Sequence, residues 1–97
     1  MTSIGYPANG PSFNGAITVG ATSTEVLAGN GKRRGAIIVN DSDEIIYLSY
    51  GDNAVLNSGI RLNAGGGSLS IDLNNTYTGR VTAICSSGSK VLTVTEW

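Results

Sequence analysis

Short apolar segments recur along most of this chain, about every 8–12 residues, and no segment keeps the 3.6-residue period of an amphipathic helix. Each segment is rich in β-branched or aromatic residues and ends at Gly, Asn, Asp or Ser, which turns favour. The pattern therefore predicts about eight short strands. The expected strands are 16–19, 24–28, 34–40, 44–50, 59–63, 68–73, 81–85 and 90–97.

Eight short strands in a chain of 97 residues predict an all-β fold, a small antiparallel β-sandwich or jelly-roll-like domain over residues 16–97. Segments 36–39 and 45–50 flank a short Asp-Ser-Asp turn, so we expect them to pair as a central hairpin. The unbroken apolar run at 36–39 also favours a strand that is covered on both faces. Only 13% of the residues are charged, so the chain has few charges with which to protect the edges of its sheets.

Residues 1–15 differ from the rest because they contain both prolines and follow neither a helical nor a strand period. They form either a disordered tail, as chain ends often do, or an extended arm that folds when it docks on a neighbour. The apolar residues Ile4, Tyr6 and Phe13 favour an extended N-terminal arm, because a linker without a partner is more often polar throughout.

The composition argues against an enzyme. The chain has no His and one Cys, which excludes a histidine general base, a Ser-His-Asp triad, His or CxxC metal ligands and an intrachain disulfide. Its net charge of −1 provides no attraction to nucleic acid or to a membrane surface. No apolar run approaches the ~18 residues of a membrane span, and no secretory signal is expected. We therefore expect a non-enzymatic protein with no cofactor, no metal, no nucleic-acid partner and no membrane partner.

Several polar motifs carry only weak chemical signals. The run of three glycines at 65–67 lacks the Lys-Ser/Thr ending and the helix of a phosphate-binding loop, so it favours a turn. The acidic residues Asp41, Asp43 and Glu44 do not have the spacing of a calcium loop, and turn formation explains them. Cys85 lies in an apolar strand and is expected to behave as a small buried hydrophobic residue.

The basic cluster Lys32-Arg33-Arg34 holds half of the chain's six positive residues and precedes the 36–39 segment. It is either a solvated loop or an ionic contact to an acidic partner surface. Three positive charges without interleaved aromatic residues supply too few phosphate contacts for nucleic-acid binding.

Many of these segments together resemble a pattern found in small virion proteins of tailed phages and prophages. In that pattern a T-S-T-x-V-L-A strand leads through a basic loop to a hydrophobic strand that ends in Asn. The resemblance covers about residues 20–97. The segments that carry it are 21–28, 32–40, 46–51, 58–62, 64–66, 77–84 and 94–97. The chain thus resembles head accessory proteins, the capsid cement or decoration proteins.

The resemblance implies a protein made in the bacterial cytoplasm that binds the major capsid protein lattice on the outer surface of the virion and stabilises the mature head. Such proteins commonly sit as trimers at three-fold positions, so a homotrimer is expected, and many carry an N-terminal arm. The expected partner-binding residues are Ile4, Tyr6, Phe13, Lys32, Arg33, Arg34 and Trp97. The alternative is a tail, head-fibre or baseplate component that binds host carbohydrate through Tyr50, Asn53 and Tyr77.

Overall fold

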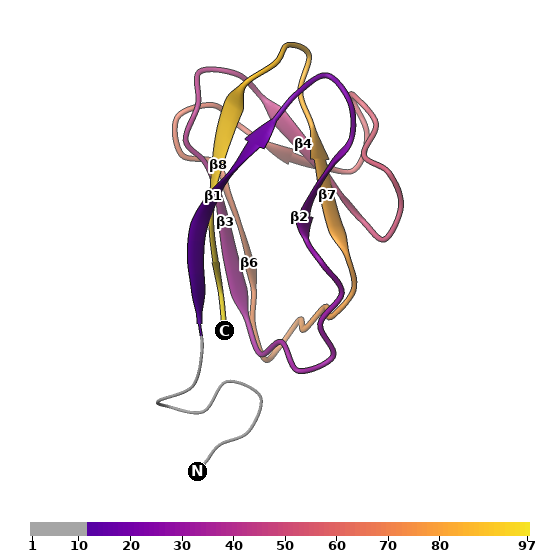
Figure 1. Ribbon diagram of the computed structural model, residues 1–97, viewed down its shortest axis with the longest axis vertical. Helices are drawn as coiled ribbons and strands as arrows, with labels where there is room; N and C mark the ends of the chain where they lie inside the picture. The colour runs from indigo at the N-terminus through magenta and orange to yellow at the C-terminus, as the bar shows by residue number, and fades with distance from the viewer. Residues whose placement is uncertain (1–11) are drawn as a thin grey trace.

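The computed structural model describes residues 12–97, and these form eight strands (Figure 1). The strands are β1 (Phe13–Val19), β2 (Thr24–Leu27), β3 (Ala36–Asn40), β4 (Ile46–Tyr50), β5 (Ile60–Leu62), β6 (Ser68–Ile71), β7 (Val81–Ile84) and β8 (Lys90–Glu96). Each predicted segment overlaps one of them, so the all-β prediction is confirmed. In the described part of the chain, no helix is long and apolar enough to cross a membrane.

Two antiparallel sheets of four strands pack against each other. The first sheet has the order β1-β8-β3-β6, and the second has the order β2-β7-β4-β5. The pairs β1–β8, β2–β7, β3–β6 and β4–β5 nest within one another along the chain, as in one long hairpin that has been rolled up. The pairs β3–β8 and β4–β7 then complete the two sheets. This connectivity is that of a jelly roll, which confirms the predicted sandwich.

The predicted hairpin between β3 and β4 is wrong, because the two strands lie in different sheets. The connection between them crosses from the first sheet to the second instead of turning back within one sheet. The expectation that β3 is covered on both faces is also wrong. Ile37 is 40% exposed, whereas Ile38 is fully buried, so only one face of the strand is covered.

The facing sides of the two sheets form a single core. Its largest fully buried apolar side chains are Ile38, Ile46, Leu48, Leu62, Ile71 and Leu92. Side chains alternate along β8, and Leu92 and Val94 are buried and face this core.

The seven loops lie at two ends of the sandwich. One end holds the β1–β2, β3–β4, β5–β6 and β7–β8 loops. The other end, called the terminal end below, holds the β2–β3 and β6–β7 loops together with the start of β1 and the C-terminus (Figure 1). The β4–β5 loop begins at this end, where the Gly51 N–H donates to the Arg80 carbonyl oxygen. Because β1 begins at Phe13 and pairs from Phe13 onward with β8, residues 13–15 belong to the sheet. The boundary expected after residue 15 therefore falls inside a strand. The turn-forming residues Asn14 and Gly15 hid its beginning.

Candidate partner-binding site

The terminal end brings together segments from three parts of the chain. Phe13 is paired with Glu96, and the N–H groups of Arg34 and Gly35 donate to the carbonyl oxygen of Trp97 at 2.7 and 3.0 Å. Phe13 and Trp97 therefore lie close to the loop that carries Lys32, Arg33 and Arg34, which we call the basic loop. The predicted arm residues Ile4 and Tyr6 lie outside the described residues.

Arg33 is part of the interior, which corrects its prediction as a partner contact. Its side chain is fully buried, and its Nε donates to the Glu96 carboxylate at 2.7 Å. One terminal nitrogen donates to the carbonyl oxygens of Tyr77 and Gly79 at 2.8 and 2.9 Å, and the other donates to that of Ala28 at 2.7 Å. A planar guanidinium with five donors can serve all four acceptors at once. Arg33 thus joins the β2–β3 loop to the β6–β7 loop and to β8.

A sequence signal for this buried pair lay in β8. Glu96 shares its face with Leu92 and Val94, so it follows a row of residues that face the core. A carboxylate in such a row needs a cation or hydrogen-bond donors. The basic loop could supply that cation, but the three adjacent basic residues look alike in the sequence.

Trp97 is half-buried and lies across Gly35. A Cβ atom added at Gly35 would come within 2.7 Å of the Trp97 ring and within 2.8 Å of the Ile71 carbonyl oxygen. The Trp97 N–H also donates to the Gly35 carbonyl at 2.9 Å, which extends the β3–β8 pairing by one residue. The indole is therefore held in a fixed position beside the basic loop.

The exposed side chains at this end combine cations with aromatic rings. Lys32 and Arg34 are exposed on either side of the buried Arg33, and Phe13 is 45% exposed. Together with Trp97 they form what we call the terminal surface. Four of the seven predicted partner-binding residues are thus gathered on one surface, and Arg33 holds the loop that carries two of them.

The tyrosines expected to serve a carbohydrate site also lie at the terminal end. The rings of Tyr50 and Tyr77 are stacked, with centroids 3.9 Å apart and planes 5° apart. Arg80 donates to the Gly51 carbonyl at 3.0 Å and to the Asn53 side-chain oxygen at 3.4 Å. Tyr50 is 37% exposed, and partial burial raises the pKa of its phenol. Both rings and one amide are therefore brought into a single group.

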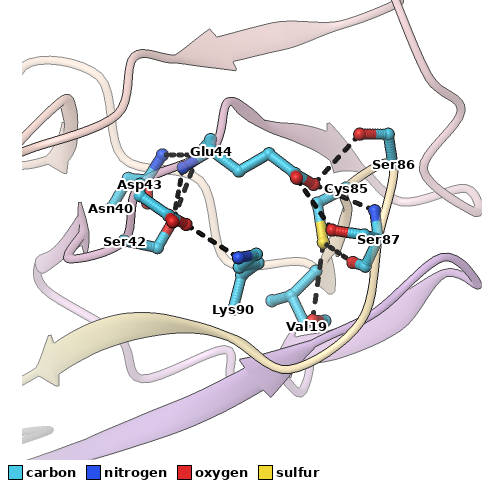
Figure 2. Close-up of polar contacts among 9 residues, drawn as sticks. All are labelled: Val19, Asn40, Ser42, Asp43, Glu44, Cys85, Ser86, Ser87 and Lys90. Carbon is cyan, nitrogen blue, oxygen red and sulfur yellow. Dashed lines mark hydrogen bonds and ion pairs between the residues drawn. The ribbon is translucent and has the colours of Figure 1, made fainter.

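The opposite end of the sandwich holds a separate polar group, the Glu44 cluster, which consists of Glu44, Ser86 and Ser87 (Figure 2). The Glu44 carboxylate accepts hydrogen bonds from the Ser86 hydroxyl at 3.0 Å and from the Ser87 N–H and hydroxyl at 2.9 and 2.8 Å. These donors, the Ser87 hydroxyl first, lower the pKa of Glu44 to about 2. The cluster ties the β3–β4 loop to the β7–β8 loop.

The acidic residues of the β3–β4 loop do not converge. Asp43 points away from Glu44 toward Lys90, with a distance of 2.7 Å between carboxylate and ammonium (Figure 2). Among residues 12–97, no group of three or more His, Cys, Asp or Glu side chains is placed to hold a metal ion. Cys85 is fully buried, as expected, and burial raises the pKa of its thiol.

We expect the Glu44 cluster to make stability depend on pH in acid. The folded-state pKa of about 2 lies below the ordinary value of 4.5. The contribution of Glu44 to the stability of the fold is therefore complete above pH 4.5 and is lost as the pH falls toward 2. Urea unfolding of the wild type and Glu44→Gln from pH 7 to pH 2 measures this difference. The wild type should be more stable at pH 7, and the gap should narrow below pH 4.5. A gap that stays constant over this range would contradict the assignment.

The comparisons with known proteins identify no relative of this chain. No protein-family model, no curated protein and no solved structure matches it. Its function is therefore argued from its own residues and from the sequence pattern described above.

Proposed function

We propose that this protein is a phage capsid cement protein, which binds the major capsid protein lattice on the outer surface of the head and stabilises the mature shell. The observation that carries the proposal, beside the resemblance in sequence, is the terminal surface. Exposed Phe13, Lys32 and Arg34 lie there with Trp97, where the N-terminal segment enters the sandwich. The jelly-roll fold does not decide the matter, since capsid proteins and lectins share it.

The chemistry of the terminal surface suits a clamp. Aromatic side chains such as Phe13 and Trp97 provide a large contact area at a low cost in conformational entropy. Lys32 and Arg34 would face acidic groups on the capsid, while Ile4 and Tyr6 would anchor the arm on a neighbouring subunit. The buried Arg33 keeps the loop in one conformation before binding, which reduces the entropy that binding costs.

A clamp of this kind needs no catalysis. The packaged genome pushes the capsid subunits apart, and a protein that binds only the expanded lattice stabilises that lattice by mass action. Many copies act on one shell, so modest affinity at each site is sufficient.

The proposal is tested by cosedimentation with purified expanded and unexpanded shells. The full chain should bind the expanded shells in preference. Deletion of residues 1–11 leaves β1 intact, because that strand begins at Phe13, so the truncated protein should fold. It should bind the expanded shells much more weakly. Undiminished binding by the truncated protein would contradict the role of the arm, and equal binding to both kinds of shell would contradict the cement function.

The basic residues of the terminal surface should contribute an ionic part of this affinity. We expect the double variant Lys32→Ser/Arg34→Ser to bind expanded shells about 3- to 10-fold more weakly at low salt, since exposed ion pairs contribute ~0.2–1 kcal/mol each. The difference should shrink as salt screens the charges. Arg61→Ser removes an exposed cation from β5, in the second sheet, and is the matched control for the single variants Lys32→Ser and Arg34→Ser, which are measured beside the double variant. An equal effect of Arg61→Ser would show that net charge alone is responsible.

The second candidate function is a tail, head-fibre or baseplate component that binds host carbohydrate. The stacked Tyr50 and Tyr77 favour it, because sugars stack on aromatic rings and Tyr50 is 37% exposed. The Asn53 side chain is held nearby by Arg80, which also binds the Gly51 carbonyl oxygen. A glycan array tests it directly. Glycan binding by the wild type that is lost in the Tyr50→Ala variant would support this function. An array to which the wild type does not bind would exclude this function.

A further inference from the structure

The four sheet edges of the jelly roll are not equally protected. β5 has three residues and carries Arg61, and β2 has four residues with an irregular register between Glu25 and Leu27. β6 is also only four residues long. β1 differs because its seven residues contain no charge and no proline, and its register with β8 is regular from Phe13 to Val19. Short strands, bulges and charges are what protect an edge, so among residues 12–97 β1 is the least protected edge.

The hydrogen bonds of β8 with β3 show which residues of β1 direct their backbone N–H and C=O groups away from the sheet. Trp97 exchanges two hydrogen bonds with Gly35, and the Val91 carbonyl accepts from Asp41, so odd-numbered residues of this segment direct their backbone groups toward β3. Even-numbered residues of β8 therefore face β1. In the observed register they lie opposite residues 13, 15, 17 and 19 of β1. Asn14, Ala16 and Thr18 thus direct their N–H and C=O groups away from the sheet, where no other strand of residues 12–97 pairs with them.

Within the bounds of its four strands, the outer face of the first sheet carries no charge. The alternation of the strands places ten uncharged residues on this face. These residues are Asn14, Ala16, Thr18, Ile37, Val39, Ser68, Ser70, Val91, Thr93 and Thr95. Two copies aligned edge to edge would therefore bring no like charges together.

We propose that β1 pairs antiparallel with β1 of a second copy, so that the two first sheets become one continuous sheet. A strand that pairs antiparallel with its own copy does so about a two-fold axis, and the contact is self-complementary. With the axis at Ala16, all seven residues of the strand are paired, and Asn14 lies opposite Thr18 of the second copy. In this register Asn14, Ala16 and Thr18 each exchange their outward N–H and C=O groups with the copy.

This inference does not depend on the capsid proposal. It also differs from the homotrimer that the sequence resemblance implies, because two identical edges that pair with each other close as a dimer. Light scattering of the purified full chain distinguishes the two states. The expected mass at high concentration is twice the 9.9 kDa of one chain.

The key variant is Ala16→Pro. Proline removes the N–H that would bond across the axis, and β8 does not use this N–H, so the monomer should still fold. We expect Ala16→Pro to be monomeric and the matched control Ala16→Ser, which keeps the N–H, to be dimeric. Circular dichroism checks that both variants fold. If Ala16→Pro does not fold, Ala16→Lys serves instead, since it keeps the N–H but places like charges opposite each other at the axis and should also be monomeric.

Amide hydrogen exchange gives an independent readout. The amides of Asn14, Ala16 and Thr18 should become protected as the protein concentration rises. Protection that does not depend on concentration would assign the edge to the chain's own N-terminal residues, and protection only on added shells would assign it to a capsid strand. Either result would overturn the proposal. So would a wild type that is monomeric or trimeric at every concentration, or a folded Ala16→Pro that remains dimeric.

Discussion

Arg33→Met is expected to lower the free energy of unfolding by about 3–5 kcal/mol, the usual cost of leaving one partner of a buried ion pair alone. Methionine keeps much of the apolar stem but removes every donor. The Glu96 side chain is only 13% exposed, so its carboxylate would lose a partner without gaining full hydration. The carbonyls of Ala28, Tyr77 and Gly79 would lose their side-chain donor at the same time.

A double-mutant cycle with Glu96→Gln separates the charge from the rest of the network. The variant Arg33→Met/Glu96→Gln should be less destabilised than the sum of the two single variants, because it leaves no unpaired carboxylate. Urea unfolding at neutral pH measures all four proteins. Arg61→Met is the matched control, since it replaces an exposed arginine of β5 and should change stability by no more than about 0.5 kcal/mol. Equal losses for Arg33→Met and Arg61→Met would contradict the buried network.

Arg33→Lys tests the geometry of the same network. A lysine keeps the positive charge, but its single ammonium group cannot reach four acceptors that lie around a planar fork. We therefore expect this variant to recover only part of the loss measured for Arg33→Met. Full recovery would show that charge alone, without the forked geometry, holds the loop.

The positions of the strands could be predicted because the signals for them are local. Alternation along 60–63 and 68–73, and turn residues after each apolar run, depend only on neighbouring positions. The assignment of β3 and β4 to different sheets is not local. A short polar connection can close a hairpin or cross to the other sheet, and the packing of the whole sandwich decides between them.

The same distinction explains what was missed at the terminal surface. The composition of the Lys32-Arg33-Arg34 loop indicates an ionic contact with a partner. It does not indicate which of the three side chains turns inward. Arg33 turns inward because remote segments bring Glu96 and the carbonyls of the β6–β7 loop to that position. Alternation in the sequence places Glu96 on one face of β8 with Leu92 and Val94, and the burial of these two residues identifies that face as the core side.

Asn40→Asp should lower the free energy of unfolding as much as the loss of Arg33 does, although asparagine and aspartate have nearly the same shape. Asn40 is fully buried in β3, and its amide nitrogen donates to the carbonyl oxygens of Glu44 at 2.7 Å and Leu62 at 3.0 Å. Leu62 belongs to β5, so this amide joins the two sheets. A carboxylate would turn an acceptor oxygen toward these two carbonyls. We expect a loss of about 3–5 kcal/mol at neutral pH, as for other unpaired buried charges.

The pH dependence of this loss identifies its cause. Burial against two carbonyl oxygens raises the folded-state pKa of the introduced carboxyl above its unfolded value of about 3.9. The charge penalty is therefore absent below pH ~3.9, grows as the pH rises, and is complete above the raised folded-state pKa. The difference in free energy of unfolding between the wild type and Asn40→Asp should therefore become smaller as the pH falls. A smaller difference should remain in acid, because the variant still lacks one of the hydrogen-bond donors of the amide. Asn40→Ala introduces no titrating group, so its difference from the wild type should be nearly the same at pH 7 and pH 4. Urea unfolding of the wild type, Asn40→Asp and Asn40→Ala at pH 7 and pH 4 measures these differences. If the difference in free energy of unfolding between the wild type and Asn40→Asp were the same at both pH values, a buried charge would not be its cause.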